Sequence, residues 1–391
     1  MNGYVGKLLA VDLSSGELQS LALDPAVARQ YIGGSGLAAR LFLDRLTAPP
    51  PDAFDSANPL IIMTGPVAGH QLPGSSRFAV CARSPLTDLW GESSCGGYFA
   101  PALKAAGYDG IIVTGAAAHP VYLLVQDGKA ELRAADGLWG MDTYAVDDAL
   151  KAAHGALART LSSGAAGEKL VRFAAAVHDK GHVAGRTGMG AVMGSKRLKA
   201  VVALGKGRTA AADPASITTI RGEVLARQAD SLAAQTFHAF GTAGSLYVGT
   251  MMGDVPFQNW RTGGWDDDAI QGLDGTAMEA TILTGTPTCH SCSIACKRQV
   301  AVTDGPYRVP EGPGPEYETV AAFGTMLLNA DLKSVAKANE MCNRLGLDAI
   351  SAGATIAFAT EATEKGLLAT DLSWGDAPAV LRAVEAIANR M

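Results

Sequence analysis

The sequence has few aromatic residues and no concentration of positive charge. Aromatic residues make up 6% of the 391 positions and apolar residues 48%, a composition that supports a hydrophobic core but neither a disordered chain nor an aromatic-rich binding module. The net charge is −6, and lysine and arginine form no block. The electrostatic signature of a nucleic-acid or acidic-membrane binder is therefore missing, and we expect neither partner.

A membrane-spanning run and an export signal are missing as well. A transmembrane helix needs about 18 consecutive apolar residues or more, and no such run occurs. The N-terminal segment turns polar after a few apolar residues and has no charged start, apolar stretch and cleavage site in series. We therefore expect a soluble, cytoplasmic protein.

Cysteine is too scarce for a disulfide framework, but its distribution is uneven. Three of the six cysteines, Cys289, Cys292 and Cys296, stand within eight positions. Thiolates separated by two and three residues on a tight loop can converge on one metal centre, and three of them make three corners of a cubane iron–sulfur cluster. Zinc would usually take a second cysteine pair or histidines at set spacing, so we favour an iron–sulfur cluster over zinc or an incidental group.

A cubane cluster needs a fourth ligand, and the remaining cysteines are poor candidates. Cys342 has helical spacing to apolar neighbours, which predicts a small buried residue. Cys81 belongs to a strand-like run and Cys95 to a glycine turn. None is a convincing fourth corner.

Glycine is abundant, with 46 residues and no collagen-like repeat, which indicates many tight turns and close backbone approaches. Glycine loops can turn backbone N–H groups toward an anion, and Arg77, Arg83 and Arg186 stand beside such loops, where they could pair with a phosphate. None of the loops matches a Walker or dinucleotide fingerprint, and each alone is more often a plain turn. Together they favour a phosphorylated cofactor. The loops cover residues 33–36, 65–69, 93–97 and 184–190.

The length suggests two domains, and the pattern changes near residue 208. Up to that point, short β-branched runs between glycine turns predict an α+β domain with a large β-sheet. Residues 205–214 are small and polar and predict a linker. Apolar residues at helical spacing over 218–239 and 332–365 predict a mainly α-helical second domain. The predicted domains are therefore 1–208 and 209–391.

Individual elements of the first domain are also predicted. A hairpin should turn across Asp127 and Gly128, because Asp-Gly is a strong hairpin signal between alternating strands. The predicted strands cover residues 7–13, 59–63, 77–82, 110–114, 121–125 and 130–133, and the predicted helices cover 25–31 and 144–154.

Glu316 and Glu318 flank a tyrosine about twenty residues after the cysteines. Beside a redox centre, one of them could act as a general base once buried. The spacing alone favours a solvated acidic turn.

A series of blocks in one order resembles the tungsten-dependent aldehyde:ferredoxin oxidoreductases over the whole length. The resemblance implies a tungsten, occasionally molybdenum, between two pterin dithiolenes, a 4Fe–4S cluster, and a magnesium ion that links the pterin phosphates. It implies oxidation of an aldehyde to a carboxylic acid, with electrons passing to ferredoxin or an iron–sulfur partner subunit, and a possible homo-oligomer. The blocks are KLLAVDLSSGE, IGGSGLAARL, MTGPVAG, SSRFAVCARSPLT, CGGYFAPALKAAGYDGIIVTG, AGRTGMGAVMGSKRLKAV, CHSCSIAC, GPEYETVAAFG and CNRLGLDAIS.

The resemblance also implies roles for particular residues. It places the proton acceptor at Glu318, with Glu316 as the second choice, and the arginine between cluster and pterin at Arg77. Other roles carried over are cluster ligation by Cys289, Cys292 and Cys296, magnesium ligation by the carbonyls of Ser94 and Ala184, and cofactor binding by Gly96, Gly97, Gly185, Arg186, Asn343, Gly346, Leu347 and Asp348.

The sequence departs from the family pattern at several positions. The first pterin motif begins with Asn343 in place of an aspartate. Lys337 and Glu340 replace the glutamate and histidine that bridge some dimers through a metal, so no such bridge is expected. In the family, the second pterin motif, the fourth cluster cysteine and an active-site histidine lie in a third region, and this chain stops at Met391 before them. Residues 1–391 alone are therefore expected to bind at most a labile, sub-stoichiometric cluster and to show no aldehyde oxidation.

Three rival hypotheses remain open from the sequence. A related catalytic subunit could act on another low-potential substrate, such as an aromatic acyl thioester. A non-catalytic fragment could carry the cluster without a complete tungstopterin. A zinc-stabilised structural protein is the third possibility.

Overall fold

The computed structural model describes residues 1–46, 48, 50 and 52–391, and these form two compact units. The first unit contains Met1–Val224 together with two short segments from later in the chain, Cys289–Cys292 and Arg344–Leu347. The second contains Leu225–Thr288, Ser293–Asn343 and Asp348–Met391. The division of the chain into domains 1–208 and 209–391 stays a prediction.

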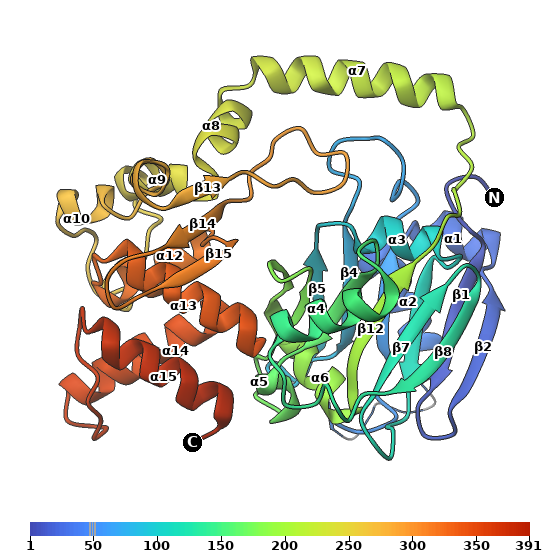
Figure 1. Cartoon of the computed structure of the whole chain (residues 1–391), viewed down its shortest axis with the longest axis horizontal. Helices are drawn as coiled ribbons and strands as arrows, with labels where there is room; N and C mark the ends of the chain where they lie inside the picture. The colour runs from blue at the N-terminus through green and yellow to red at the C-terminus, as the bar shows by residue number, and fades with distance from the viewer. Residues whose placement is uncertain (47, 49, 51) are drawn as a thin grey trace. The chain divides into compact units, whose positions relative to one another are not determined.

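The described strands of the first unit form two six-stranded mixed sheets (Figure 1). One sheet has the order β2-β1-β6-β3-β4-β5 and the other the order β11-β10-β9-β12-β7-β8. The strands of the first sheet are β1 Lys7–Asp12, β2 Glu17–Ala22, β3 Leu60–Thr64, β4 Phe78–Arg83, β5 Trp90–Cys95 and β6 Gly110–Thr114. Those of the second are β7 Val121–Gln126, β8 Lys129–Ala134, β9 Arg159–Ser163, β10 Ala176–His178, β11 His182–Ala184 and β12 Leu198–Leu204.

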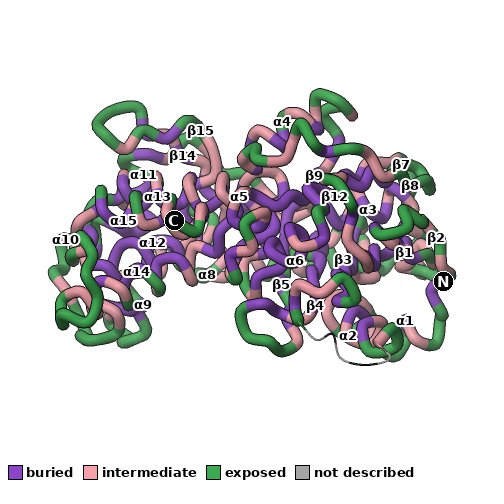
Figure 2. The backbone as a smooth tube through the Cα atoms, turned by 90° about the horizontal axis from the view of Figure 1, so that it is seen from below, coloured by how far each residue is buried: buried purple, intermediate pink, exposed green. Residues whose placement is uncertain are grey.

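The first unit is layered because its central strands are apolar on both faces. All five residues of β3 are buried (the buried trace is purple in Figure 2), so this strand needs cover on each side. Helix α2 Gly34–Arg45 packs on one face of the first sheet. The other face shares a core with the second sheet and with helices α3 Phe99–Ala105 and α6 Met189–Ser195. Helix α4 Thr143–His154 packs on the outer face of the second sheet.

Local signals explain where several helices of the first unit begin. The Asp24 side chain accepts a hydrogen bond from the Ala26 N–H and a proline occupies the first turn, so α1 Pro25–Tyr31 begins directly after Asp24. The Asp142 side chain likewise accepts from two N–H groups at the start of α4. The short α5 Ala165–Glu168 contacts α6.

The second unit is mainly helical. Its one described sheet has three antiparallel strands, β13 Leu283–Gly285, β14 Gln299–Val302 and β15 Val309–Pro313. Helix α7 Pro214–Asp230, which spans the change from one unit to the other, has no buried residue. The remaining helices are α8 Leu232–Phe240, α9 Leu246–Met252, α10 Asp267–Gln271, α11 Gly275–Thr281, α12 Tyr317–Phe323, α13 Leu332–Leu345, α14 Ala349–Glu364 and α15 Ala377–Asn389.

The predicted fold class is confirmed. The strand-rich first part divides its strands between two sheets, and the later part is mainly helical. The predicted helical stretches 218–239 and 332–365 are each interrupted, at Ser231 and at residues 346–348. Among the described helices, none is both long enough and apolar enough to cross a bilayer.

Candidate cofactor site

The three clustered cysteines lie on the loop between β13 and β14. Cys289, Cys292 and Cys296 form no disulfide and are partly exposed. The Cys292 N–H donates to the Cys289 carbonyl at 3.1 Å, which closes a turn across the first pair. Ser291 and Ala295 have positive φ angles of 55° and 54°. Residues other than glycine adopt this left-handed conformation mainly in tight turns. The motif therefore presents reachable thiols from an irregular, tightly turned segment.

The other cysteines are buried in regular structure. Cys81 lies in β4, Cys95 ends β5 and Cys342 lies in α13, as its helical spacing predicts. Burial raises the pKa of the Cys81 thiol to about 12, with a smaller contribution from Glu92. Burial also raises the pKa of Cys342. Because the thiolate is the form that binds metal, these buried thiols are poor ligands.

A glycine turn at the end of β5 contacts the first cysteine of the motif. The Gly97 N–H donates to Cys289 Sγ at 3.2 Å, and the His290 N–H donates to the Gly97 carbonyl at 3.2 Å. A Cβ atom on Gly96 would lie 3.0 Å from the same sulfur, so a side chain there would crowd the thiol. Gly96, Gly97 and Cys289 are thus brought together from positions almost two hundred residues apart.

Arg77 is oriented by the neighbouring strand. Its Nε donates to Ser94 Oγ at 2.8 Å and its Nη2 to the Ser94 carbonyl at 3.1 Å. These two bonds fix the plane of an exposed guanidinium at the start of β4. The Ser94 carbonyl, a predicted magnesium ligand, therefore already accepts one hydrogen bond, and magnesium ligation by it stays a prediction.

A pocket of about 350 Å³ adjoins Arg77. Three of the four predicted glycine loops contribute to its walls, together with the inner edge of β4. Gly33 is required there by close approach, because a Cβ atom would lie 2.7 Å from the Thr64 carbonyl. The lining comprises Ile32, Gly33, Gly34, Ser35, Gly65, Pro66, Arg77, Phe78, Ala79, Glu92, Ser93 and Ser94.

The fourth glycine loop follows β11 and serves packing in part. Ala184 is buried, whereas Gly185 is half-buried and Arg186 exposed. A Cβ atom on Gly190 would lie 2.3 Å from the Ala175 carbonyl. The glycines within α6 therefore let this helix approach neighbouring backbone closely, an interpretation that the phosphate-loop hypothesis did not include.

The segment Arg344–Leu347 belongs to the first unit. The Ala175 N–H donates to the Gly346 carbonyl at 2.8 Å, and Leu347 forms an antiparallel bridge with Ala174. Gly346 has a φ of 70°, and a Cβ atom there would lie 2.7 Å from the Gly164 nitrogen. Two of the predicted pterin-binding residues, Gly346 and Leu347, therefore pair with the backbone of residues 174–175.

The flanking residues of that motif lie in the second unit. Asn343 is buried in α13. Asp348 is 2% exposed and caps α14, where its Oδ1 accepts from the Ile350 N–H at 3.0 Å. A capping role accounts for Asp348 without a ligand, so cofactor binding by these two residues stays a prediction.

The two candidate glutamates differ in their surroundings. Glu316 precedes α12, where its carboxylate accepts from Thr242 Oγ1 at 2.6 Å and pairs with Lys297 Nζ at 2.8 Å. Although burial opposes this effect, Lys297 and Thr242 hold the pKa of Glu316 below its usual value. Glu318 is exposed in the first turn of the same helix. The Glu316 carboxylate is therefore already engaged in an ion pair and a hydrogen bond, whereas the Glu318 carboxylate is more exposed to solvent.

The described part of the chain gives no support to a preformed mononuclear metal site. It contains no group of three or more His, Cys, Asp or Glu side chains placed to hold one ion. Such convergence is what a structural zinc site requires, whereas the corners of a cubane bind different irons. In α13, Lys337 Nζ instead pairs with Glu340 Oε2 at 2.6 Å.

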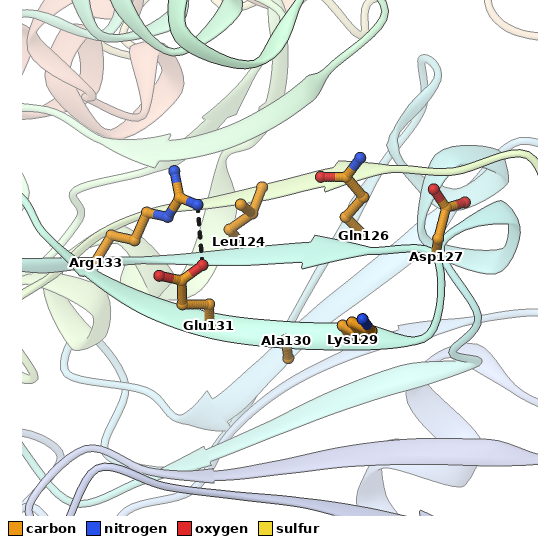
Figure 3. A pocket seen from close by; sticks show the side chains of 7 residues that line it. All are labelled: Leu124, Gln126, Asp127, Lys129, Ala130, Glu131 and Arg133. Carbon is orange, nitrogen blue, oxygen red and sulfur yellow. Dashed lines mark hydrogen bonds and ion pairs between the residues drawn. The ribbon is translucent and has the colours of Figure 1, made fainter.

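A more open pocket of about 500 Å³ lies on the β7–β8 hairpin (Figure 3). Its side chains are polar or charged for the most part, and Arg133 pairs at 2.9 Å with Glu131, which lies two residues earlier on β8. None of the predicted site residues lines it.

Sequence reasoning missed the side chains that support these positions. Lys297 and Thr242 around Glu316 come from distant segments, and the buried His178 lies beneath the Gly97 turn. The only local signal was a histidine at the end of an otherwise apolar strand, AAAVH.

The chain matches two domain families along almost its full length. Residues 8–205 match the aldehyde ferredoxin oxidoreductase N-terminal domain, and residues 221–391 match domains 2 and 3 of the same family.

Similar curated proteins carry related names. The tungsten-containing aldehyde ferredoxin oxidoreductase of Pyrococcus furiosus is 38% identical over 97% of this chain, and that of Thermococcus kodakarensis is 37% identical over 97%. The aliphatic sulfonate oxidoreductase WOR-like subunit of Pyrococcus furiosus is 31% identical over the whole chain. The chain spans 62% of the length of the first two proteins and 65% of the third.

A solved structure is also similar. It is described as the active-site complex BamBC of benzoyl coenzyme A reductase with 1,5-dienoyl-CoA, and it superposes with a TM-score of 0.88 at 28% identity. The match covers 100% of this chain and 61% of that one. The two domain matches, together with 38% identity over nearly the whole chain, establish that this protein belongs to the aldehyde ferredoxin oxidoreductase family, a family of oxidoreductase enzymes.

Proposed function

We propose that this chain belongs to an enzyme that oxidises an aldehyde to a carboxylic acid at a bis-pterin tungsten centre, with a 4Fe–4S cluster as the electron exit. The observation that carries the proposal is the hydrogen bond from the Gly97 N–H to Cys289 Sγ. It joins a glycine loop of the first sheet to the first cysteine of the cluster motif. The tungsten and the aldehyde come from the names of relatives that are 37% and 38% identical.

The residues fit an iron–sulfur cluster chemically. The three thiols of the motif are partly exposed, while the other described cysteines are buried. The Gly97 N–H donates a hydrogen bond to Cys289 Sγ. Sulfur ligands of iron–sulfur clusters accept hydrogen bonds of this kind because they carry negative charge. Cys289, Cys292 and Cys296 would therefore hold three corners of the cluster.

The residues also fit a phosphorylated pterin. The pocket beside Arg77 is walled by glycine loops, so backbone N–H groups can approach an anion closely. The Arg77 guanidinium donates two hydrogen bonds to Ser94, which fix its plane. The remaining N–H donors of Arg77 therefore have a fixed direction and can bind a phosphate. Magnesium ligation by the carbonyls of Ser94 and Ala184 is part of this proposal, as are cofactor contacts from Gly185, Arg186 and Asn343.

In the reaction, the aldehyde carbon gains an oxygen from water while two electrons and two protons leave. The tungsten–pterin group and the cluster, when bound, supply the two-electron oxidation and the one-electron transfers. Glu318 accepts one of the protons that leave, because it is exposed in the first turn of α12 and, among the described residues, has no ion-pair partner like that of Glu316. Arg77 holds the phosphorylated cofactor in place by charge.

The proposed electron acceptor is ferredoxin or an iron–sulfur partner subunit, and the proposed location is the cytoplasm. A partner subunit is supported by the similar solved structure, which is described as a complex.

The test is anaerobic expression with tungstate, followed by measurement of tungsten, iron and acid-labile sulfide and of aldehyde-dependent reduction of benzyl viologen. Tungsten together with iron and turnover of an aldehyde is the expected result for a version that also carries the family's third region, whereas residues 1–391 alone should hold at most a labile cluster and oxidise no aldehyde. Iron without tungsten would favour a non-catalytic fragment that carries the cluster. Zinc alone would overturn the proposed iron–sulfur cluster.

A second candidate function is reduction of an aromatic acyl thioester. The whole-chain superposition on the benzoyl coenzyme A reductase structure favours it. The same preparation separates the two candidates, because aldehyde oxidation reduces viologen whereas reoxidation of reduced viologen by benzoyl-CoA requires the thioester activity.

A further inference from the structure

His178 is a buried polar side chain outside the predicted site. It ends β10 and is fully buried. The rings of Phe78 and Phe99 lie 6.2 and 5.8 Å from its centroid, and the His182 ring stacks on it at 5.6 Å. A ring that has left water completely must find its hydrogen-bond partners inside the protein.

The hydrogen bonds of His178 define its protonation. Nδ1 lies 2.7 Å from the Thr160 carbonyl, which can only accept, so Nδ1 carries the hydrogen. Nε2 lies 2.9 Å from the Tyr98 nitrogen and 3.1 Å from the Phe99 nitrogen, both of which can only donate. The imidazole is therefore neutral, with Nε2 as the acceptor of two backbone N–H groups.

One nearby charge, the Asp179 carboxylate, favours the protonated ring, but two cations pair with it. Asp179 Oδ2 lies 3.3 Å from His178 Nε2, but Asp179 is also paired with Lys151 and Arg159, each at 3.0 Å. Burial lowers the pKa of His178 and outweighs the opposing effect of Asp179.

The two N–H groups that His178 accepts belong to the residues directly after Gly97. Gly97 itself has a φ of 90°, and a Cβ atom there would lie 2.6 Å from His178 Cδ2 and 2.9 Å from His182 Cδ2. On its other side, the Gly97 N–H faces Cys289 Sγ at 3.2 Å. The turn is thus held between an imidazole beneath it and a thiol above it.

We propose that His178 is a positioning residue that keeps the Gly97 N–H on Cys289 Sγ and thereby raises the reduction potential of the cluster bound by Cys289. The inference rests on the proposed cluster. A hydrogen bond to a ligand sulfur stabilises the more negative, reduced state, so losing it makes reduction harder. His178 acts through Gly97 and touches neither the cluster nor the substrate.

The test compares two neutral replacements in the anaerobically purified holoprotein. In His178→Gln, the amide can place its oxygen near the position of Nε2 and still accept from Tyr98 and Phe99. In His178→Asn, the shorter amide can reproduce only the Nδ1 donor to Thr160. Both variants remove the ring and stay neutral, Asn leaves a void larger by one methylene group, and the two differ in their support of the turn.

The readout is a redox titration of the cluster followed by electron paramagnetic resonance. We expect His178→Asn to lower the ratio of reduced to oxidised cluster at a fixed solution potential by about three- to tenfold, the worth of one hydrogen bond of this kind. A tenfold change corresponds to about 59 mV for a one-electron couple. His178→Gln should stay close to the native ratio.

A measurement on the native protein covers the case in which the Asn variant does not fold. The reduced cluster should show magnetic coupling to one nearby exchangeable proton, which disappears in deuterium oxide, because the Gly97 N–H faces the ligand sulfur.

The outcomes separate the inference from the proposed function. A native protein without iron and sulfide overturns the cluster and this inference together. A native cluster whose potential is equal in all three proteins, or which shows no exchangeable coupled proton, overturns the inference alone.

Discussion

The two units position their candidate residues in different ways. In the first unit the candidate residues are positioned by backbone. Gly33, Gly97 and Gly190 lie where a Cβ atom would collide with neighbouring atoms. A main-chain N–H contacts the Cys289 sulfur. In the second unit they are positioned by side chains, since Glu316 is held by Lys297 and Thr242. Backbone positions tolerate little change, whereas side-chain pairs can be exchanged one group at a time. Substitutions should therefore be severe in the first unit and graded in the second.

The largest expected effect is on the cysteine that meets the glycine turn. Cys289→Ser should abolish the iron–sulfur absorbance and reduce iron content by most of its native value, because the Gly97 N–H would face a poor iron ligand. Iron analysis and visible spectroscopy measure this. The matched control is Cys342→Ser, a buried thiol of α13, which should lose stability but keep its iron. Equal iron in both variants would exclude Cys289 as a ligand.

The second comparison sets the two glutamates against each other. Glu318→Gln should lower kcat by roughly 10² to 10⁴ with unchanged tungsten and iron, because it removes the accepting carboxylate. Glu316→Gln, the control on the neighbouring turn, should keep kcat within a few-fold. Steady-state kinetics on both variants decide the assignment, and a reversed pattern would transfer the role of proton acceptor to Glu316.

The third prediction contrasts a packed glycine with an open one. Gly190→Ala should destabilise the protein by about 1–3 kcal/mol, because its Cβ atom would meet the Ala175 carbonyl at 2.3 Å. Gly222→Ala in α7, where nothing lies within 4 Å of the added atom, should stabilise by about 0.5–1 kcal/mol. Denaturant unfolding gives both values. A tolerated Gly190→Ala would show that α6 can move away from its neighbours.

The smallest expected effect is on acid stability. The folded-state pKa of Glu316 is below its unfolded value, so its pairing contributes stability above the unfolded pKa, near 4.3, and that contribution is lost as the pH falls through the folded pKa. Glu316→Gln should therefore lower the unfolding free energy at pH 7 by less than about 1 kcal/mol and flatten its fall below pH 5. Unfolding curves from pH 3 to 7 test this, and an unchanged pH slope would count against the Lys297 pair.

Features with local causes were predictable from the sequence. Asp24 and a following proline define the start of α1, and the hairpin turns where expected because Asp127 and Gly128 both have positive φ angles, 46° and 81°. The buried run of β6 was likewise predicted with the bounds that the structure shows.

Features with distant causes were not predictable. Helical periodicity over 332–365 did not show the break at Gly346, whose φ of 70° is a local helix-ending signal, or the bridge between Leu347 and Ala174, which joins distant segments. Nor could spacing separate Glu316 from Glu318, since the difference lies in Lys297 and Thr242. The contact of Gly97 with Cys289 depends on chain folding over 192 positions. The family resemblance named the candidate site residues, while the sequence by itself indicated a metal-binding cysteine loop and glycine loops suited to a phosphorylated cofactor.

The inclusion of Arg344–Leu347 in the first unit has a consequence for how the chain is made. During synthesis the ribosome completes Met1–Val224 well before the segment that pairs with Ala174 and Ala175 emerges. At about 5–20 residues per second, the intervening stretch takes about 6–25 s to translate. Throughout that interval the Ala175 N–H lacks the Gly346 carbonyl to which it donates in the native fold. This unit therefore finishes folding late, and a chaperone that shields this part of the unit would raise the yield of native protein.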